Sequence, residues 1–488
     1  MLYLCSRPAD PALMPDWRQD WLSRLDADPF LAPLWASHQR RDAYWKHGSV
    51  CEDWTAIRTP VQIWGGWADN YMNTVSQLVE NLSSPVKGIV GPWVHLYAHQ
   101  AVPGPAIGFL DEALRWWDRW LKDIPNAVDQ DPAYRVWMQH STPPSAVATH
   151  RPGHWVSEAT WPSPRVTSVA LPLSPGRIGG AGGPLSQRIS TPQYLGLHAG
   201  EFFPMSLNAE MAGDQRHDDA LSDCFDRDVL TAPLDLIGAA KLRLRLTSDR
   251  PRTSLVARLC DVGPDGASTR IAQGMLNLCH AAGHEAPSAL TPGKPIDVTL
   301  TLDQMAHRLA SGHRLRLALS TTYWPFLWPS PDVATLTLHE ASLTLPHHQG
   351  SDNEWTPPEP AAGPAWPQRI LRPATAARNL DHDLVSGRRR LTILDDSGEI
   401  EHLEHGMITG SGCEEVWSIT EGDPLLAEVV INCRQTLRRG DWQVRTETWT
   451  RLTGTATALK HEARLVAYEG ETLVFERGWH VAVPRDLV

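Results

Sequence analysis

Residues 61 to 95 read VQIWGGWADNYMNTVSQLVENLSSPVKGIVGPWVH, and this stretch decides the fold of the region around it. The runs VQIW and VKGIV are short and apolar, which is typical of buried strands. The segment between them repeats apolar residues along one helix face, at Tyr71, Val75, Leu78, Val79 and Leu82. A strand, a helix and a second strand of these lengths predict a βαβ unit with two parallel strands.

Each predicted strand runs into a loop of glycine and tryptophan that carries one titratable residue, first Asp69 and then His95. Because the carboxyl ends of parallel strands meet at one edge of a sheet, we expect these side chains to lie close together. They are 26 residues apart, which suits two loops joined by one helix. His95 would then be a general base that Asp69 orients, as in a catalytic triad. The alternative is that Asp69 only caps the following helix and that His95 is an ordinary loop histidine.

A second amphipathic helix is predicted after this unit, at GFLDEALRWWDRWLKDI, residues 108–124. Its apolar face is formed by Leu110, Ala113, Leu114, Trp117 and Leu121. Parallel sheets bury both faces and need several strands. Two parallel strands and two helices therefore cannot form a whole sheet domain.

Changes of pattern along the chain predict five parts. Residues 1–57 carry apolar residues at helical spacings broken by prolines, which is typical of short helices that cover another part of the molecule. Residues 58–125 contain the βαβ unit and the second helix, as the end of an α/β domain. Residues 126–349 alternate apolar and polar residues between turn signals, which predicts a β-sandwich of the jelly-roll class. Residues 350–372 read as a proline-rich linker or surface strap, and residues 373–488 predict a further β-rich module.

Composition narrows the class of protein. A chain of 488 residues predicts about three domains, and 42% apolar with 20% charged residues fit a soluble globular protein. The net charge of −12 argues against nucleic acid as the partner, because phosphate binding needs a concentrated basic face. The 22 tryptophans are compatible with large domain or subunit contacts, including a homo-oligomer.

Cysteine usage and the N-terminus bear on the compartment. The seven cysteines are odd in number and form no CxxC pair, so neither a zinc site nor a disulfide scaffold is indicated. Arg7 and Pro8 interrupt the N-terminus before a signal-peptide core could form, and no apolar run reaches the length of a membrane span. We therefore expect a cytoplasmic protein.

Several motifs together resemble the CocE/NonD family of serine hydrolases, which is allied to the X-Pro dipeptidyl-peptidases. GGWADNY, GPWVH and FLDEALRWWDRWLK are similar to the end of the family's hydrolase domain, and LAPLWASHQRRDAYW is similar to the last part of its helical cap. LDLIGAAKLRLRLTSDRPRTSLVARLCDVGPDGASTRIAQG and SGHRLRLALSTTYWPFLWPSP resemble its C-terminal jelly roll. The resemblance covers residues 16 to about 345. It implies that Asp69 is the triad acid and His95 the triad base.

The sequence departs from this family at the nucleophile. The family's serine lies on a Gly-x-Ser-x-Gly type elbow that precedes the acid and the histidine, and no such motif occurs in these 488 residues. The nearest strings are GASTR at residues 266–270 and TGSGC at residues 409–413, and neither has the strand-to-helix context of an elbow. The resemblance implies that the elbow, the oxyanion-hole tyrosine and most of the sheet precede the cap. We therefore expect a C-terminal fragment, a mis-started reading frame or one half of a split protein.

Other motifs carry weaker signals. His95 and His99 have the i, i+4 spacing of a metal pair, but the glutamate of H-E-x-x-H is missing, and we expect no metal and no organic cofactor. The acidic run at residues 214–228 lacks an EF-hand register and is predicted to be a solvated loop rather than a calcium site. The aromatic segment at residues 320–331 suits either packing of the jelly roll against the hydrolase domain or a wall of an acyl pocket.

The predicted function is hydrolysis of ester or amide bonds, including peptide bonds, through a serine acyl-enzyme whose nucleophile is missing from this chain. The chain alone would then be inactive. Trp67, Tyr71 and Trp93 adjoin the acid and the base in sequence and are the candidate substrate-pocket residues. The expected partners are a small-molecule ester, amide or peptide substrate and a missing N-terminal hydrolase segment, with neither nucleic acid nor membrane. The alternative is a non-catalytic β-sandwich binding or assembly module that carries an inactive hydrolase remnant.

Overall fold

The predicted βαβ unit is present. The computed structural model describes residues 2–180, 182–205, 209–350 and 355–488. Strand β1 (Val61–Gly66) and strand β2 (Val86–Gly91) pair in parallel, from Val61 opposite Val86 to Gly66 opposite Gly91. Helix α5 (Met72–Asn81) connects them, and its residues Val75 and Val79 are buried against the sheet. The two valines are four residues apart, close to one helical turn of 3.6 residues. They therefore lie on the same face of the helix, which docks on the sheet.

Strand β3 (Tyr134–His140) extends the parallel sheet. Gly88 of β2 lies opposite Tyr134, and the pairing is parallel. The sequence analysis placed this strand in the β-rich region that follows. The structure instead makes it the link between the two regions, because its far end pairs with strand β12 (Ile296–Leu309). Strand β4 (Gly153–Glu158) adds to β3 in antiparallel orientation.

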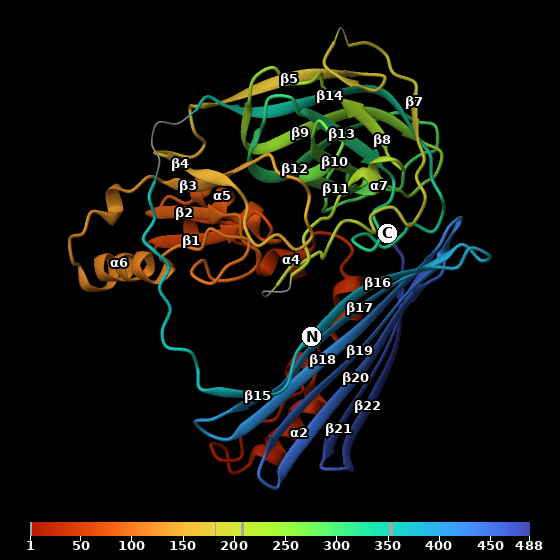
Figure 1. Ribbon diagram of the computed structural model, residues 1–488. Helices are drawn as coiled ribbons and strands as arrows, with labels where there is room; N and C mark the ends of the chain where they lie inside the picture. The colour runs from red at the N-terminus through yellow and green to blue at the C-terminus, as the bar shows by residue number, and fades with distance from the viewer. Residues whose placement is uncertain (1, 181, 206–208, 351–354) are drawn as a thin grey trace.

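Helix α6 (Phe109–Lys122) is present, but its apolar face is not covered. Leu110, Leu114, Trp117 and Leu121 are between 45% and 73% exposed. The helix is held by its other side, where Trp116 and Glu112 are buried. Figure 1 shows α6 projecting from the body of the molecule beside β1 and β2.

The region from residue 126 to residue 349 is rich in strands, as expected. Beyond β3, β4 and β12 its strands are β5 (Val166–Ser174), β6 (Arg177–Ile178), β7 (Gln187–Ile189), β8 (Asp223–Asp226), β9 (Leu234–Ser248), β10 (Ser254–Val262), β11 (Ser268–Asn277), β13 (Arg314–Ser320) and β14 (Leu336–His348). β12, β9, β14 and β5 pair in that order, and β8, β13, β10 and β11 pair in that order. Alternate residues of both sets form one buried leucine-rich core, with Leu242, Leu246, Leu259 and Leu317 among its members. The period-2 pattern of the sequence is thus explained by burial of one strand face.

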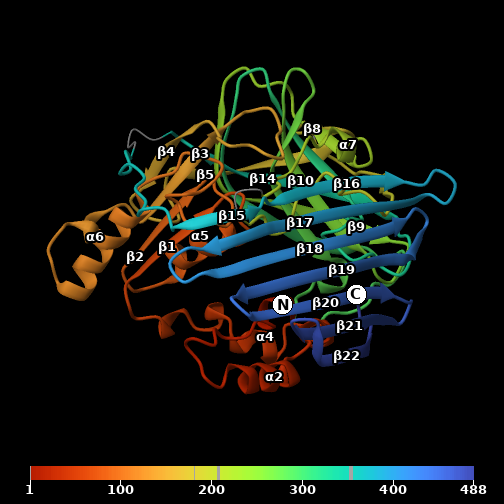
Figure 2. The same cartoon turned by 60° about the horizontal axis from the view of Figure 1, so that its bottom comes forward.

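The last part of the chain forms a long antiparallel sheet. Its strands are β15 (Gln368–Arg372), β16 (Thr375–His382), β17 (Arg388–His402), β18 (Met407–Thr420), β19 (Asp423–Arg439), β20 (Trp442–Gly454), β21 (Ala458–Glu469) and β22 (Thr472–Pro484). The order is β15-β17-β18-β19-β20-β21-β22, and β16 also pairs with β17. Figure 2 shows these strands side by side across the front of the molecule. The β-rich pattern after residue 373 is therefore explained by a sheet in which consecutive strands form hairpins.

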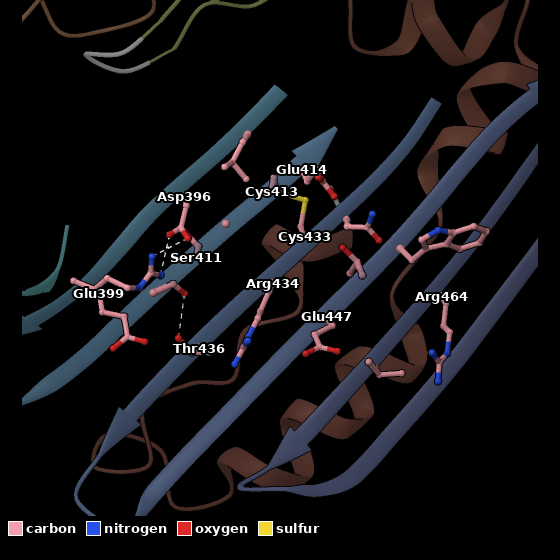
Figure 3. Close-up of a pocket in the computed structure, with 18 residues that line it drawn as sticks. Asp396, Glu399, Ser411, Cys413, Glu414, Cys433, Arg434, Thr436, Glu447 and Arg464 are labelled. Atoms are coloured by element: carbon pink, nitrogen blue, oxygen red, sulfur yellow. Dashed lines mark hydrogen bonds and ion pairs between the residues drawn. A yellow bond between two sulfur atoms is a disulfide. The ribbon is translucent and has the colours of Figure 1, made fainter. Parts of the chain in front are cut away.

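The N-terminal helices cover one face of this C-terminal sheet. They are α1 (Leu2–Cys5), α2 (Trp17–Ala27), α3 (Leu31–Ser37) and α4 (Ala43–His47), followed by the short 3-10 helices Val50–Glu52 and Trp54–Ala56. Trp21 and Leu25 of α2 are fully buried against Val444, Leu465 and Ala467. The expectation that these helices cover another part of the molecule is confirmed. The opposite face of the sheet carries charged side chains, among them Arg434, Glu447 and Arg464 (Figure 3).

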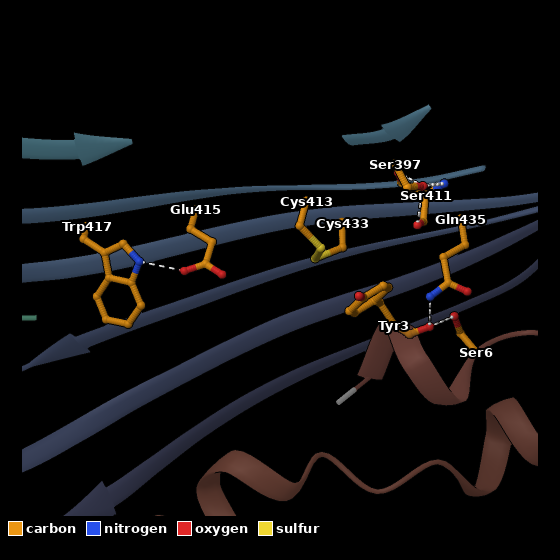
Figure 4. Close-up of a disulfide and its surroundings, with 9 residues drawn as sticks. All are labelled: Tyr3, Ser6, Ser397, Ser411, Cys413, Glu415, Trp417, Cys433 and Gln435. Carbon is orange, nitrogen blue, oxygen red and sulfur yellow. Dashed lines mark hydrogen bonds between the residues drawn. A yellow bond between two sulfur atoms is a disulfide. The ribbon is translucent and has the colours of Figure 1, made fainter. Parts of the chain in front are cut away.

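Two cysteines of the C-terminal sheet form a disulfide, which corrects the sequence prediction. Cys413 of β18 and Cys433 of β19 are directly opposite each other, with their Cα atoms 4.1 Å apart (Figure 4). Their pairing depends on the register of two strands, which an odd count of cysteines does not reveal. Cysteine usage therefore no longer supports the expectation of a cytoplasmic protein.

The acidic run at residues 214–228 also differs from its prediction as a solvated loop. It contains helix α7 (Arg216–Asp219) and strand β8, and both Asp218 and Asp219 are less than 5% exposed. Asp219 pairs at 3.0 Å with the fully buried Arg258 and at 3.2 Å with Arg316. The Asp219 carboxylate is stable in the interior because these basic side chains of the sandwich strands neutralise it.

The proline-rich segment lies against the surface of the body. Trp355 packs edge-on against Trp155 at 4.9 Å, and the carbonyl of Pro358 accepts a hydrogen bond from the Gly108 amide. Residues 351–354 of this linker lie outside the described residues. Within the described residues, no helix is both long enough and apolar enough to cross a lipid bilayer.

Candidate active site

Glycines bring the ends of β1 and β2 into contact. A Cβ atom on Gly66 would lie 2.0 Å from the carbonyl oxygen of Trp93, and one on Gly91 would lie 2.2 Å from the Trp93 ring. Only glycine therefore allows this close approach. The amides of Trp67 and Ala68 then donate hydrogen bonds to the carbonyls of Gly91 and Trp93, at 2.9 and 3.0 Å. The two loops that carry Asp69 and His95 are thus locked together.

The structure places the predicted acid next to the predicted base. Nδ1 of His95 lies 2.9 Å from Oδ2 of Asp69. The other carboxylate oxygen, Oδ1, accepts a hydrogen bond from the Tyr71 amide at 3.0 Å. Asp69 therefore holds the turn before α5 and also holds the histidine ring, while the catalytic role of the pair stays a prediction. With only 7% of Asp69 exposed, this orientation is well defined.

The imidazole of His95 is held from several sides but remains accessible. Its backbone amide donates to the carbonyl of Pro204 at 3.1 Å, and its ring packs against Phe203 at 4.8 Å and Tyr71 at 5.7 Å. Within the described residues Nε2 makes no hydrogen bond, and the side chain is 43% exposed. A histidine with one ring nitrogen fixed by a carboxylate and the other free has the geometry of a general base.

The three predicted pocket residues take different places. Trp67 is 9% exposed, donates its Nε1 hydrogen to the Trp137 carbonyl and lines the cavity beside Asp69. Tyr71 is 56% exposed and contacts His95 by its ring. Trp93 is 2% exposed and lies in an apolar cluster, so it supports the loop from within. It does not line the cavity beside Asp69.

A cavity of about 320 Å³ adjoins Asp69 and contains residues that the sequence analysis missed. It lies between the α/β region and the sandwich, and Glu201, Arg270 and Phe326 contribute to its wall. Phe326 belongs to the aromatic segment at residues 320–331, while its neighbour Trp324 packs against Trp417 of the C-terminal sheet. One residue of that segment thus lines the cavity beside Asp69 and another packs on the C-terminal sheet, while its role as a wall of an acyl pocket stays a prediction.

Glu201 is the most unusual titratable group of this wall. Burial, together with the nearby carboxylate of Glu210, raises the pKa of Glu201 to about 7. Arg378 of β16 pairs with Glu210 at 2.8 Å, which ties the loop that carries Glu201 to the C-terminal sheet. No local sequence signal marks Glu201, because its environment is assembled from distant segments.

The candidate metal pair is not assembled. His95 is engaged with Asp69, whereas His99 stacks on Phe109 at 5.7 Å. Throughout the described part of the chain, no group of three or more His, Cys, Asp and Glu side chains is arranged to hold a metal ion.

Comparison with known proteins gives the family. The model of the X-Pro dipeptidyl-peptidase C-terminal non-catalytic domain matches residues 126–375, just over half of the chain. A second model, X-Pro dipeptidyl-peptidase (S15 family), matches residues 5–97 and so includes Asp69 and His95. The chain therefore belongs to the CocE/NonD-like family, which is allied to the X-Pro dipeptidyl-peptidases.

Individual relatives agree with this assignment. The chain is 23% identical to the cocaine esterase of Rhodococcus sp. over 331 residues, which cover 61% of this chain and 54% of that protein. An aminopeptidase from a Thaumarchaeota archaeon has a similar structure, with a TM-score of 0.55 at 15% identity over 67% of this chain and 62% of that one. A CocE/NonD family hydrolase from Staphylococcus aureus gives a TM-score of 0.51 at 15% identity over 68% and 62%. The chain thus spans about half the length of the cocaine esterase, and the solved structures are similar in fold.

Proposed function

We propose that this chain carries the acid and the base of a serine hydrolase that cleaves ester or amide bonds. The observation that carries the proposal is the Asp69–His95 pair at the adjoining ends of two parallel strands, with Nε2 of His95 free. The relatives named as cocaine esterase and aminopeptidase act on bonds of this type, as their names state. The acyl group and the leaving group are not specified by this pair.

The proposed mechanism uses the two residues in the order of a triad. Nε2 of His95 takes the proton of a serine hydroxyl as the serine oxygen attacks the carbonyl carbon of the substrate. The imidazolium then returns this proton to the leaving alcohol or amine, and an acyl-enzyme forms. Water repeats the sequence and releases the acid. Asp69 holds Nδ1 of His95 and stabilises the imidazolium throughout.

We further propose that the nucleophilic serine belongs to a segment outside these 488 residues. The sequence has no Gly-x-Ser-x-Gly elbow to offer it. Two surfaces next to the site suit such a segment. Strand β1 is the last strand at its end of the sheet, so its outer backbone edge can pair with another strand. The exposed apolar face of α6 is the kind of surface that packs against a further layer of an α/β sheet.

The test uses this chain alone and in a mixture with the polypeptide encoded immediately upstream. Each preparation is treated with a fluorophosphonate probe and assayed with p-nitrophenyl acetate. We expect the probe to label only the upstream polypeptide, and hydrolysis to require both parts. In the mixture, His95→Ala should lower kcat by about 10³-fold or more. The matched control is His47→Ala, which removes an exposed histidine outside the site.

Three results would contradict the proposal. Labelling of this chain alone would show that its nucleophile is present. Near-normal turnover by the His95→Ala mixture would remove His95 from the mechanism. An upstream coding region without a serine elbow would leave the proposed nucleophile without a source.

A further inference from the structure

A second cavity lies far from the Asp69–His95 pair in the sequence, between the N-terminal helices and the C-terminal sheet. Its volume is about 500 Å³, within the range of small-molecule sites. Helices α1 and α3 form one side, and strands β17 to β21 form the other. We call it the helix–sheet cavity.

The walls of the helix–sheet cavity are mainly apolar. Its apolar lining consists of Leu2, Tyr3, Phe30, Leu31, Ala32, Trp35, Ile393, Val429, Ile431, Leu452 and the disulfide. Figure 4 shows the Tyr3 ring beneath the disulfide, on the same side of the sheet as the N-terminal helices. Such a lining removes apolar ligand surface from water, which favours binding by about 25 cal/mol per Å².

The lining of the cavity includes a buried polar group without a partner among the described residues. His461 is 6% exposed, lines the cavity, and its Nε2 atom has no hydrogen-bond partner among the described residues. Burial lowers the pKa of His461, so its imidazole is neutral at pH 7 and Nε2 can bond an uncharged oxygen. Phe30 packs edge-on against the same ring, at 6.3 Å.

Two other buried polar groups of this sheet face are satisfied by the helices. The hydroxyl groups of Thr446 and Ser6 are 2.8 Å apart, and the Gln435 amide donates to the Tyr3 carbonyl at 2.8 Å. An unsatisfied buried group costs about 1–3 kcal/mol, and native structures contain few of them. The free Nε2 of His461 is such a group, and because it lines the cavity, a bound molecule can supply its partner.

The mouth of the cavity has a different character. Asp395 and Ser397 of β17 are exposed there, and the Ser397 and Ser411 hydroxyls are 2.9 Å apart (Figure 4). Glu415 lines the cavity on the other side of the disulfide and accepts a hydrogen bond from Trp417 Nε1 at 2.8 Å (Figure 4). Arg451 also lines the cavity and is paired with Glu428 at 2.7 Å, so the charged part of the lining contains both signs.

We propose that the helix–sheet cavity binds an uncharged, largely apolar small molecule whose hydroxyl or carbonyl oxygen bonds Nε2 of His461. The apolar walls hold the body of this molecule, and its oxygen meets Nε2 of His461. This site is separate from the proposed active site, and the proposal does not depend on the hydrolase activity.

The test measures binding of Nile red, an uncharged apolar dye with a carbonyl oxygen, to the full chain. We expect saturable binding of one dye per chain with a dissociation constant in the micromolar range and a blue-shifted emission. His461→Leu removes the polar partner and should weaken binding by about 3- to 10-fold, since one hydrogen bond contributes about 0.5–1.5 kcal/mol. The same variant should raise the melting temperature of the free protein, because it removes an unsatisfied polar group.

A filling variant provides the second arm. Thr450→Trp puts a large ring into the cavity and should weaken dye binding by more than 10-fold. Thr453→Trp introduces the same ring three residues along β20, on the opposite face of the strand, and should leave binding unchanged. Far-UV circular dichroism checks that each variant is folded. The proposal is overturned if no saturable binding occurs up to 100-fold dye excess, or if folded His461→Leu binds as tightly as the unaltered protein.

Discussion

Trp21 is the residue on which the docking of α2 depends most. It is fully buried between α2 and the C-terminal sheet, and its Nε1 donates a hydrogen bond to the Ser6 carbonyl at 2.7 Å. Replacing a buried tryptophan by alanine costs about 3–5 kcal/mol, and the lost hydrogen bond adds about 1 kcal/mol. We therefore expect Trp21→Ala to lower the free energy of unfolding of the C-terminal sheet by about 4–6 kcal/mol.

This destabilisation can be measured by urea titration with hydrogen exchange as the local readout. With an m value of about 2 kcal/mol/M, the loss corresponds to a midpoint roughly 2–3 M lower. The amides of β20 and β21 report on the sheet itself, which matters because a chain of several parts need not unfold in one step.

The matched control is Trp366→Ala, because Trp366 is 60% exposed and should shift the midpoint little. If Trp21→Ala shifted the midpoint no more than Trp366→Ala, the helices would not stabilise the sheet as the packing implies.

Two further variants test buried charges. Asp219→Asn leaves the fully buried Arg258 without its ion-pair partner and should cost about 3–5 kcal/mol, seen as a lower melting temperature. Glu201→Gln tests the raised pKa of Glu201, which is about 7. Since the folded state prefers the protonated carboxyl, its contribution to stability is full below about pH 4.5 and is lost as the pH rises through about 7. The melting temperature of Glu201→Gln relative to the unaltered protein should therefore increase from pH 5 to pH 8.5.

Each of these variants has its own control. Arg177 and Asp228 form an exposed ion pair, so Arg177→Ala should change the melting temperature little. If Asp219→Asn lowered the melting temperature no more than Arg177→Ala does, the buried ion pair would not stabilise the fold. Glu404 is exposed, and Glu404→Gln should show no such pH trend. If the difference in melting temperature between Glu201→Gln and the unaltered protein stayed constant across pH, burial would not raise the pKa of this carboxyl.

The contact between Asp69 and His95 was predictable because its signals are local. A period of 3.6 in residues 71–82 and two short apolar runs specify strand, helix and strand. The carboxyl ends of such strands necessarily adjoin, so Asp69 and His95 meet whatever the rest of the molecule does. The alternation of the β-rich regions was readable for the same reason, since one face of each strand is buried.

The remaining features depend on contacts between distant segments. Burial, together with the carboxylate of Glu210, raises the pKa of Glu201. Neither cause can be recognised from the residues next to Glu201 in the sequence. The Cys413–Cys433 disulfide follows from the register of two strands. The pattern of α6 predicts an apolar face correctly, but whether that face is covered depends on which chain segments are available to pack on it.

By itself, the sequence therefore determined the local elements, the family and the positions of Asp69 and His95, because periodicity and short motifs act over a few residues. Only the tertiary structure decided that the N-terminal helices dock on the C-terminal sheet and enclose a cavity with His461 in its lining. These segments are more than 400 residues apart in the chain. Such contacts are selected by the free energy of burying complementary surfaces, which no local pattern encodes.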